Sequence, residues 1–158
     1  MEQTKAQAAT NNETRKHIAI VGKYISLVVN KLQDRAMKHD ATKLESPEVE
    51  GFTKVTGKLS KTTYGSEDYH DTLKSDLQIA LDHHYAKNRH HPEHYPNGID
   101  DMTLIDVLEM ICDWKAATLR HNDGNILKSI EHNTDRFSIS PQLAKIMQNT
   151  VDLFEHHE

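Results

Sequence analysis

The sequence contains one cysteine and no long hydrophobic segment. Cys112 therefore cannot form an internal disulfide, and the cysteine spacing of a zinc finger is absent. The longest uninterrupted apolar run, Ile18 to Val21, ends at Gly22, so it is too short for a membrane span or for the core of a signal peptide. These absences predict a cytoplasmic protein with no membrane partner.

A basic excess is also lacking, because 19 Lys and Arg residues face 24 Asp and Glu residues, for a net charge of −5. Such a balance argues against long nucleic acid as the main partner, since no excess of cations is available to displace counterions. The 158 residues suit one domain, and a homo-oligomer stays open. Histidine is the residue in excess, at 12 of 158. This excess points to chemistry that needs imidazole.

Apolar residues recur at helical spacing, and no alternating strand pattern competes with them. The sequence thus predicts an all-α fold, a compact single-domain helical bundle over residues 13–158, preceded by a disordered arm at residues 1–12. The first predicted helix runs from residue 13 to about 32, and a second, separate helix ends near His39-Asp40. Five more helices are predicted, namely from Ser46-Pro47-Glu48 to about 60, from 64–67 through His84, from Thr103 through Leu119, from 123 to about 136, and from Pro141 to 154.

Residues 88–101 hold two prolines and a glycine, which predicts a loop between two of these helices. The loop begins after Asp82-His83-His84 and contains His90, His91 and His94. A helix start follows it, because Thr103 and Asp106 have the spacing of a capping box. A loop of this length in a compact chain is typical of a functional segment.

Neutral imidazoles and carboxylates are ligands that divalent metals prefer, so the histidines and nearby aspartates predict a metal centre. Its candidate ligands come from four helices and the loop, as in metal sites built in the core of a helical bundle. The choice within residues 83/84 and within residues 90/91 stays open. The candidates are His17, His39, Asp40, His83 or His84, His90 or His91, and Asp113.

Two spacings constrain this centre. Adjacent residues on an α-helix diverge by about 100°, so His39 and Asp40 can reach one ion only if the helix end is deformed or the ion lies between them. Asp40 could also bridge two ions. His84 and His91 would stand roughly 10 Å apart in a straight helix, which predicts that the helix breaks after about Asn88 and that the loop folds back.

The order of His17, His39-Asp40, the paired histidines and Asp113 resembles the HD-domain superfamily of metal-dependent phosphohydrolases, over residues 17–121. His90-His91, Tyr95-Pro96 and Asp113 are similar to the HD-GYP branch, although His94 stands where that branch has glycine. The run from His90 to Gly98 also resembles a small family found in bacteriophages and bacteria. If the protein is encoded by a phage, its compartment would be the host cytoplasm. The resemblance implies an HD-type fold, with His17, His39, Asp40 and Asp113 as the firmest ligands.

This resemblance implies hydrolysis of a nucleotide or related phosphate ester by water activated on one or two ions, which could be Mn, Fe, Co, Zn or Mg. We expect Asp40 at the reaction centre and Lys43 against phosphate oxygens, because an offset of four places His39 and Lys43 on one helical face. Arg89 and Arg120 could clamp phosphate, and Glu93 could relay protons. Two alternatives stay open, namely an HD-type di-iron oxygenase and a non-catalytic nucleotide- or partner-binding module with a structural metal.

Overall fold

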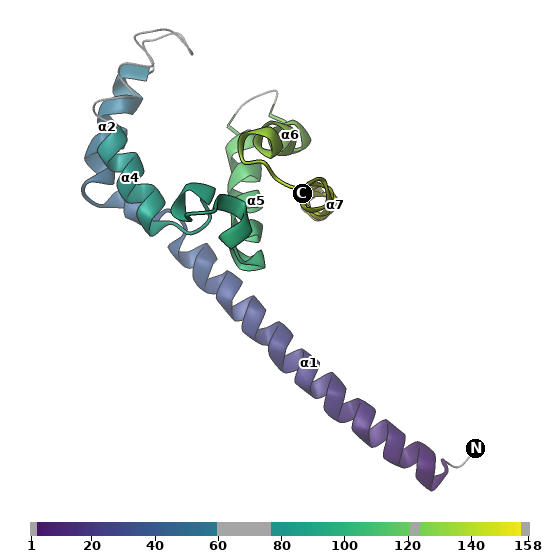
Figure 1. The fold of residues 1–158 in the computed structure, drawn as a ribbon. Helices are drawn as coiled ribbons and strands as arrows, with labels where there is room; N and C mark the ends of the chain where they lie inside the picture. Colours follow the sequence, from purple (N-terminus) through teal and green to yellow (C-terminus); the bar gives the residue numbers. More distant parts are fainter. Residues whose placement is uncertain (1–2, 60–76, 121–123, 156–158) are drawn as a thin grey trace. The chain divides into compact units, whose positions relative to one another are not determined.

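The computed structural model describes residues 3–59, 77–120 and 124–155. Within these ranges every regular element is helical, which confirms the all-α prediction (Figure 1). No helix in these ranges is long and apolar enough to cross a membrane. The α-helices are α1 (Lys5–Lys38), α2 (Glu48–Leu59), α4 (Gln78–Lys87), α5 (Leu104–Thr118), α6 (Ile126–Arg136) and α7 (Pro141–Glu155), and the 3-10 helices are η1 (Ala41–Leu44), η2 (Pro92–His94) and η3 (Gly98–Asp101).

The chain divides into two units, Met1–Met37 and Lys38–Glu158, rather than at the predicted boundary between residues 12 and 13. The first unit is almost entirely α1, which is continuous from Lys5 to Lys38. The predicted disordered arm is therefore wrong for residues 5–12, and the predicted second helix before His39 does not exist. Ala, Gln, Lys and Leu favour helix throughout this stretch, no proline interrupts it, and Gly22 costs only about 1 kcal/mol.

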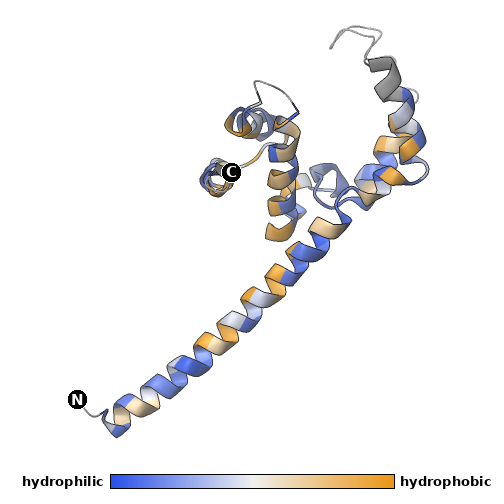
Figure 2. Cartoon of the chain, turned by 180° about the vertical axis from the view of Figure 1, so that it is seen from behind, coloured by the Kyte–Doolittle hydropathy of each residue, from blue (hydrophilic) through white to orange (hydrophobic). Residues whose placement is uncertain are grey.

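Hydrophobic and hydrophilic residues alternate along α1 (Figure 2), and none of its residues is buried. Its apolar residues lie at the helical spacing that the sequence predicted, and they include Val21, Ile25 and Val28. The helical period was thus correct.

The larger core of the second unit is formed by α5, α6 and α7. α5 begins as predicted, since Thr103 and Asp106 form the reciprocal capping box. α7 begins after Ser140, whose hydroxyl accepts a hydrogen bond from the backbone N–H of Leu143 at 3.3 Å. The buried residues of this core are Val107, Met110, Ile111, Ile126, Ile130, Ile139, Ala144, Met147 and Val151.

A smaller core lies where α2 packs against α4, and it contains Leu77 and Ala80 with Phe52 and Leu81 beside them. α2 begins at Glu48, directly after Ser46-Pro47, as predicted. α4 ends at Lys87, and the segment up to α5 contains η2 and η3 in place of a wholly irregular loop. The predicted helix start at residues 64–67 lies outside the described residues.

Candidate metal centre

His39 and Asp40 follow α1 directly, and Asp40 ends the helical path because its backbone is left-handed, with φ 55° and ψ 13°. Aspartate is one of the few residues other than glycine that adopt this conformation readily. The deformed end brings His39 Nε2 within 3.5 Å of Asp40 Oδ2. The helix end is thus deformed, which is one of the two conditions under which the adjacent side chains of His39 and Asp40 can reach one ion.

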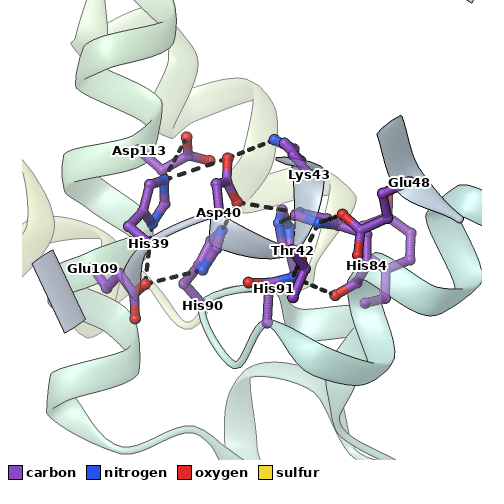
Figure 3. Close-up of polar contacts among 12 residues, drawn as sticks. His39, Asp40, Thr42, Lys43, Glu48, His84, His90, His91, Glu109 and Asp113 are labelled. Atoms are coloured by element: carbon purple, nitrogen blue, oxygen red, sulfur yellow. Dashed lines mark hydrogen bonds and ion pairs between the residues drawn. The ribbon is translucent and has the colours of Figure 1, made fainter. Parts of the chain in front are cut away.

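His84, His90 and His91 come from α4 and from the segment that follows it. Because α4 ends at Lys87, the chain turns back, and the Nε2 atoms of His84 and His91 lie 2.8 Å apart (Figure 3). His90 and His84 are fully buried, and each has its Nε2 within 3.5 Å of Asp40 Oδ1. The predicted return of the loop to the helix is confirmed for these histidines.

Asp113 reaches the same place from α5, where its Oδ1 lies 3.5 Å from His39 Nε2. Glu109 lies one turn earlier, so both carboxylates share a face of the helix. The Asp113 side chain is thus partly buried and faces His39. α5 therefore contributes two acidic side chains where the sequence suggested one.

Two sets of these side chains have donor atoms within 4.8 Å of one another, close enough to share an ion: Asp40, His84, His90 and His91 in one, and His39, His90 and Asp113 in the other. His90 belongs to both sets. Asp40 Oδ1 and both ring nitrogens of His90 are buried and without a hydrogen bond. Buried polar atoms are normally satisfied, so these atoms fit a site that holds a cation.

Two glutamates that the sequence did not single out as functional hold the far sides of these rings. Glu48 is fully buried, and its two oxygens lie 2.7 Å from His83 Nδ1 and 2.8 Å from His84 Nδ1. Glu109 Oε1 lies 3.0 Å from His39 Nδ1 and 3.2 Å from His90 Nδ1. A carboxylate on Nδ1 fixes the ring so that Nε2 presents its lone pair, which is the usual support of metal-binding histidines.

The charges around the cluster explain its titration. Hydrogen bonds to Asp113 and Glu109, with the nearby charge of Asp40, raise the pKa of His39 to about 10. Burial lowers the pKa of His91 to about 3, and the charges of His90 and His84 add to this effect. Burial also lowers the pKa of His84, although Glu48 opposes the shift. His39 is therefore protonated at neutral pH, whereas the rings of His84 and His91 are neutral. A metal ion bound by His39 would displace its proton.

Lys43 lies beside the cluster but not on a shared helical face with His39, because α1 has already ended and Lys43 belongs to η1. That part of the prediction is wrong, and the left-handed Asp40 is the physical reason. The Nζ of Lys43 instead lies 2.5 Å from Asp40 Oδ2. This ammonium lowers the pKa of Asp40 against the opposing effect of burial.

Four other predicted residues lie apart from both sets. His83 hydrogen-bonds Glu48, so His84 is the member of that pair with a position for metal binding. Arg89 forms an ion pair with Asp106 at 3.3 Å, and Glu93 pairs with Arg136 at 2.8 Å. Arg120 is exposed beyond the end of α5. None of these four is brought to the cluster as a ligand or phosphate clamp.

His17 is exposed on α1, 21 residues before Lys38 in the same continuous helix. His17 is not among the residues that the structure brings together, and its metal role stays a prediction. The cluster has its donors without it.

A family model matches residues 6–153, and its description is "Family of unknown function (DUF5662)". The chain belongs to this family. The match runs from the first turn of α1 into the last turn of α7, so the cluster lies inside the family's extent. No curated protein and no solved structure matches the chain.

Proposed function

We propose that the chain is a metal-dependent phosphohydrolase that acts on a nucleotide or a related phosphate ester. The observation that carries this proposal is the convergence of four histidines and two aspartates from three separate segments. Their side chains are backed by Glu48 and Glu109. A cluster that only stabilised the fold would not need buried nitrogen and oxygen atoms left without hydrogen bonds.

The ligands of the proposed centre are His39, Asp40, His84, His90, His91 and Asp113. A divalent ion bound there would supply Lewis acidity and a water of lowered pKa. Asp40 lies between the two sets, since its two oxygens approach His39 on one side and His84 and His90 on the other. With its oxygens presented in these two directions, Asp40 would help to hold one or two divalent ions, of the class that includes Mn, Fe, Co, Zn and Mg.

Lys43 supplies the positive charge nearest to the proposed reaction. Its ammonium is partly exposed and pairs with Asp40, so it borders the cluster from the solvent side. Binding a cation to Asp40 would compete for that carboxylate and leave Lys43 to contact phosphate oxygens. Such a contact stabilises charge that grows in the transition state.

The test is metal analysis of the purified full-length protein joined to an assay of phosphate release from a panel of nucleotides and sugar phosphates. We expect bound divalent metal, and release that stops on chelation and returns when one metal of the panel is added back. Oxygen consumption is measured on the same samples. If the protein contains metal and consumes oxygen but releases no phosphate, the di-iron oxygenase replaces the proposal. If it contains metal and shows neither activity, the non-catalytic binding module is favoured.

A further inference from the structure

A cavity of about 470 Å³ adjoins the metal cluster and is not used by any step proposed so far. His91 and Asp113 form part of its wall, so it opens directly beside the candidate ligands. The rest of the wall comes from α4, η2, α5 and α6. Besides the two ligands, the residues that matter here are the aromatic Tyr85, Trp114 and Phe137 and the charged Glu93 and Arg136.

The aromatic part of the wall is built on the larger core. Trp114 follows Asp113 on α5, and its ring lies nearly parallel to that of Phe137, with 9° between the planes. Both rings pack against the buried core residues, which fixes their positions. Flat faces held rigidly in this way suit stacking against a planar ring, which every nucleobase offers.

The charged part of the wall is a pair drawn from segments 43 residues apart. Arg136 Nη2 lies 2.8 Å from Glu93 Oε1, and the guanidinium also lies over the Phe137 ring, 4.5 Å from its centroid. The pair thus places hydrogen-bond donors and an acceptor side by side at the cavity. The edge of a nucleobase carries acceptors and donors side by side in the same way.

We propose that this cavity binds the base of a nucleoside monophosphate, with its phosphate toward Asp113 and His91 and with Trp114, Arg136 and Glu93 as specificity residues. The inference rests on the proposed function for the direction of the phosphate. The cavity volume lies in the lower part of the range for small-molecule sites, about 300–1,000 Å³, which suits one nucleoside better than a dinucleotide.

Trp114 is the only tryptophan in the chain, so its fluorescence reports directly on the cavity. The full-length protein as purified is titrated with adenosine and guanosine monophosphorothioates, which resist hydrolysis, and with ribose phosphate and inorganic phosphate. We expect at least one nucleotide analogue to quench Trp114 and to bind roughly tenfold or more tightly than ribose phosphate. Equal binding of all the probes would overturn the inference.

Variants at the charged pair identify the residues responsible. Arg136→Ala should weaken binding of the nucleotide analogue roughly tenfold, because it removes hydrogen-bond donors from the base edge. Lys128→Ala, an exposed cation on the same helix, is the matched control and should bind as the wild type does. Where Arg136→Ala does not fold, Glu93→Gln takes its place and should change the preference between adenine and guanine analogues.

Failure of this inference can be told apart from failure of the proposed function. Nucleotide-dependent quenching that is lost in Arg136→Ala, in a protein without metal or hydrolysis, keeps the cavity as a nucleotide site and removes the phosphohydrolase. Conversely, metal-dependent hydrolysis with equal kcat/KM for ribose phosphate and nucleotides, unchanged in Arg136→Ala, keeps the phosphohydrolase and overturns the base site.

Discussion

The Nε2 atoms of His84 and His91 lie 2.8 Å apart, although the two residues are seven positions apart in the sequence. His84 Nδ1 is engaged by Glu48 at 2.8 Å, which places the proton of a neutral ring on Nδ1 and leaves a lone pair on Nε2. The pKa of His91 is lowered to about 3 by burial, so its ring is neutral as well. Two neutral rings facing each other in this way are arranged to share a proton or a cation.

Removal of the Asp40 carboxylate tests the centre without disturbing the backbone. Asparagine adopts the left-handed conformation about as readily as aspartate, so Asp40→Asn preserves the deformed end of α1. We expect Asp40→Asn to be purified with little or no metal, and His39→Ala with less metal than the wild type, measured by elemental analysis. His132→Ala, an exposed histidine on α6, is the control and should keep the wild-type content. Full metal content in both site variants would contradict the metal centre.

The sequence predicted which histidines and aspartates come together and the return of the loop toward α4, because both depend on local signals. Prolines after His91 and the capping box at Thr103 fix where helices end and begin. It did not predict the roles of Glu48 and Glu109. A glutamate at a helix start or on a helix face is ordinary in sequence, and only the packing of α2 and α5 against the histidines reveals that each holds two rings.

The predicted length of the first helix was wrong for a related reason. Its apolar stripe has the correct period, but the position where a helix without proline stops depends on the single left-handed residue Asp40. From the sequence alone, an aspartate at this position is equally compatible with a continuing helix. The prediction that His39 and Lys43 share one helical face was wrong for the same reason.

The supporting glutamates should be needed for metal affinity although they touch no ion. Glu109→Gln keeps the shape of the side chain and loses its charge, which weakens the hydrogen bond with His39 Nδ1 and removes the ion-pair contact with His90 Nδ1. We expect metal affinity to fall roughly 10- to 100-fold, the scale for the loss of such partners, measured by titration of metal-free protein. Glu131→Gln on the exposed face of α6 is the control. Unchanged affinity with an intact far-UV spectrum would limit Glu109 to a structural role.

Lys43 should matter to turnover and not to metal content. Its ammonium competes with any ion for Asp40, so Lys43→Ala should retain metal at least as well as the wild type. Loss of one positive charge from the transition state should lower kcat roughly 100- to 1,000-fold. Phosphate release and elemental analysis on the same preparation check both statements. Wild-type turnover would return Lys43 to the role of a solvated lysine at a helix end.

Asp106 should make the free energy of unfolding depend on pH in the acid range, below about pH 4. Burial alone would raise its pKa, but hydrogen bonds from the side chain and backbone of Thr103 and from Arg89 outweigh burial and hold the pKa well below its usual value. A depressed folded pKa gives stabilisation that is complete above the unfolded pKa, about 3.9, and is lost as pH falls through the folded pKa.

Asp106→Asn should therefore be less stable than the wild type by about 1–2 kcal/mol at neutral pH, the scale of a lost helix cap, and the difference should shrink as pH falls below about 4. Urea unfolding at a series of pH values measures both numbers. Asp152→Asn, exposed on α7, should show no such trend. A difference that stays constant down to the lowest pH would contradict the assignment.

The number of ions is decided by His90, because it belongs to both sets of donors. If two ions are bound, His90→Ala should lower the metal content of both positions, whereas His39→Ala should spare the set formed by Asp40, His84, His90 and His91. His83→Ala is the matched control, since His83 hydrogen-bonds Glu48 and lies outside both sets.

Metal per chain is measured after gel filtration in buffer without added metal. We expect the order of content His83→Ala, then His39→Ala, then His90→Ala. A His90→Ala protein with the same content as His83→Ala would show that His90 is no ligand, and its buried, unbonded nitrogens would need another partner.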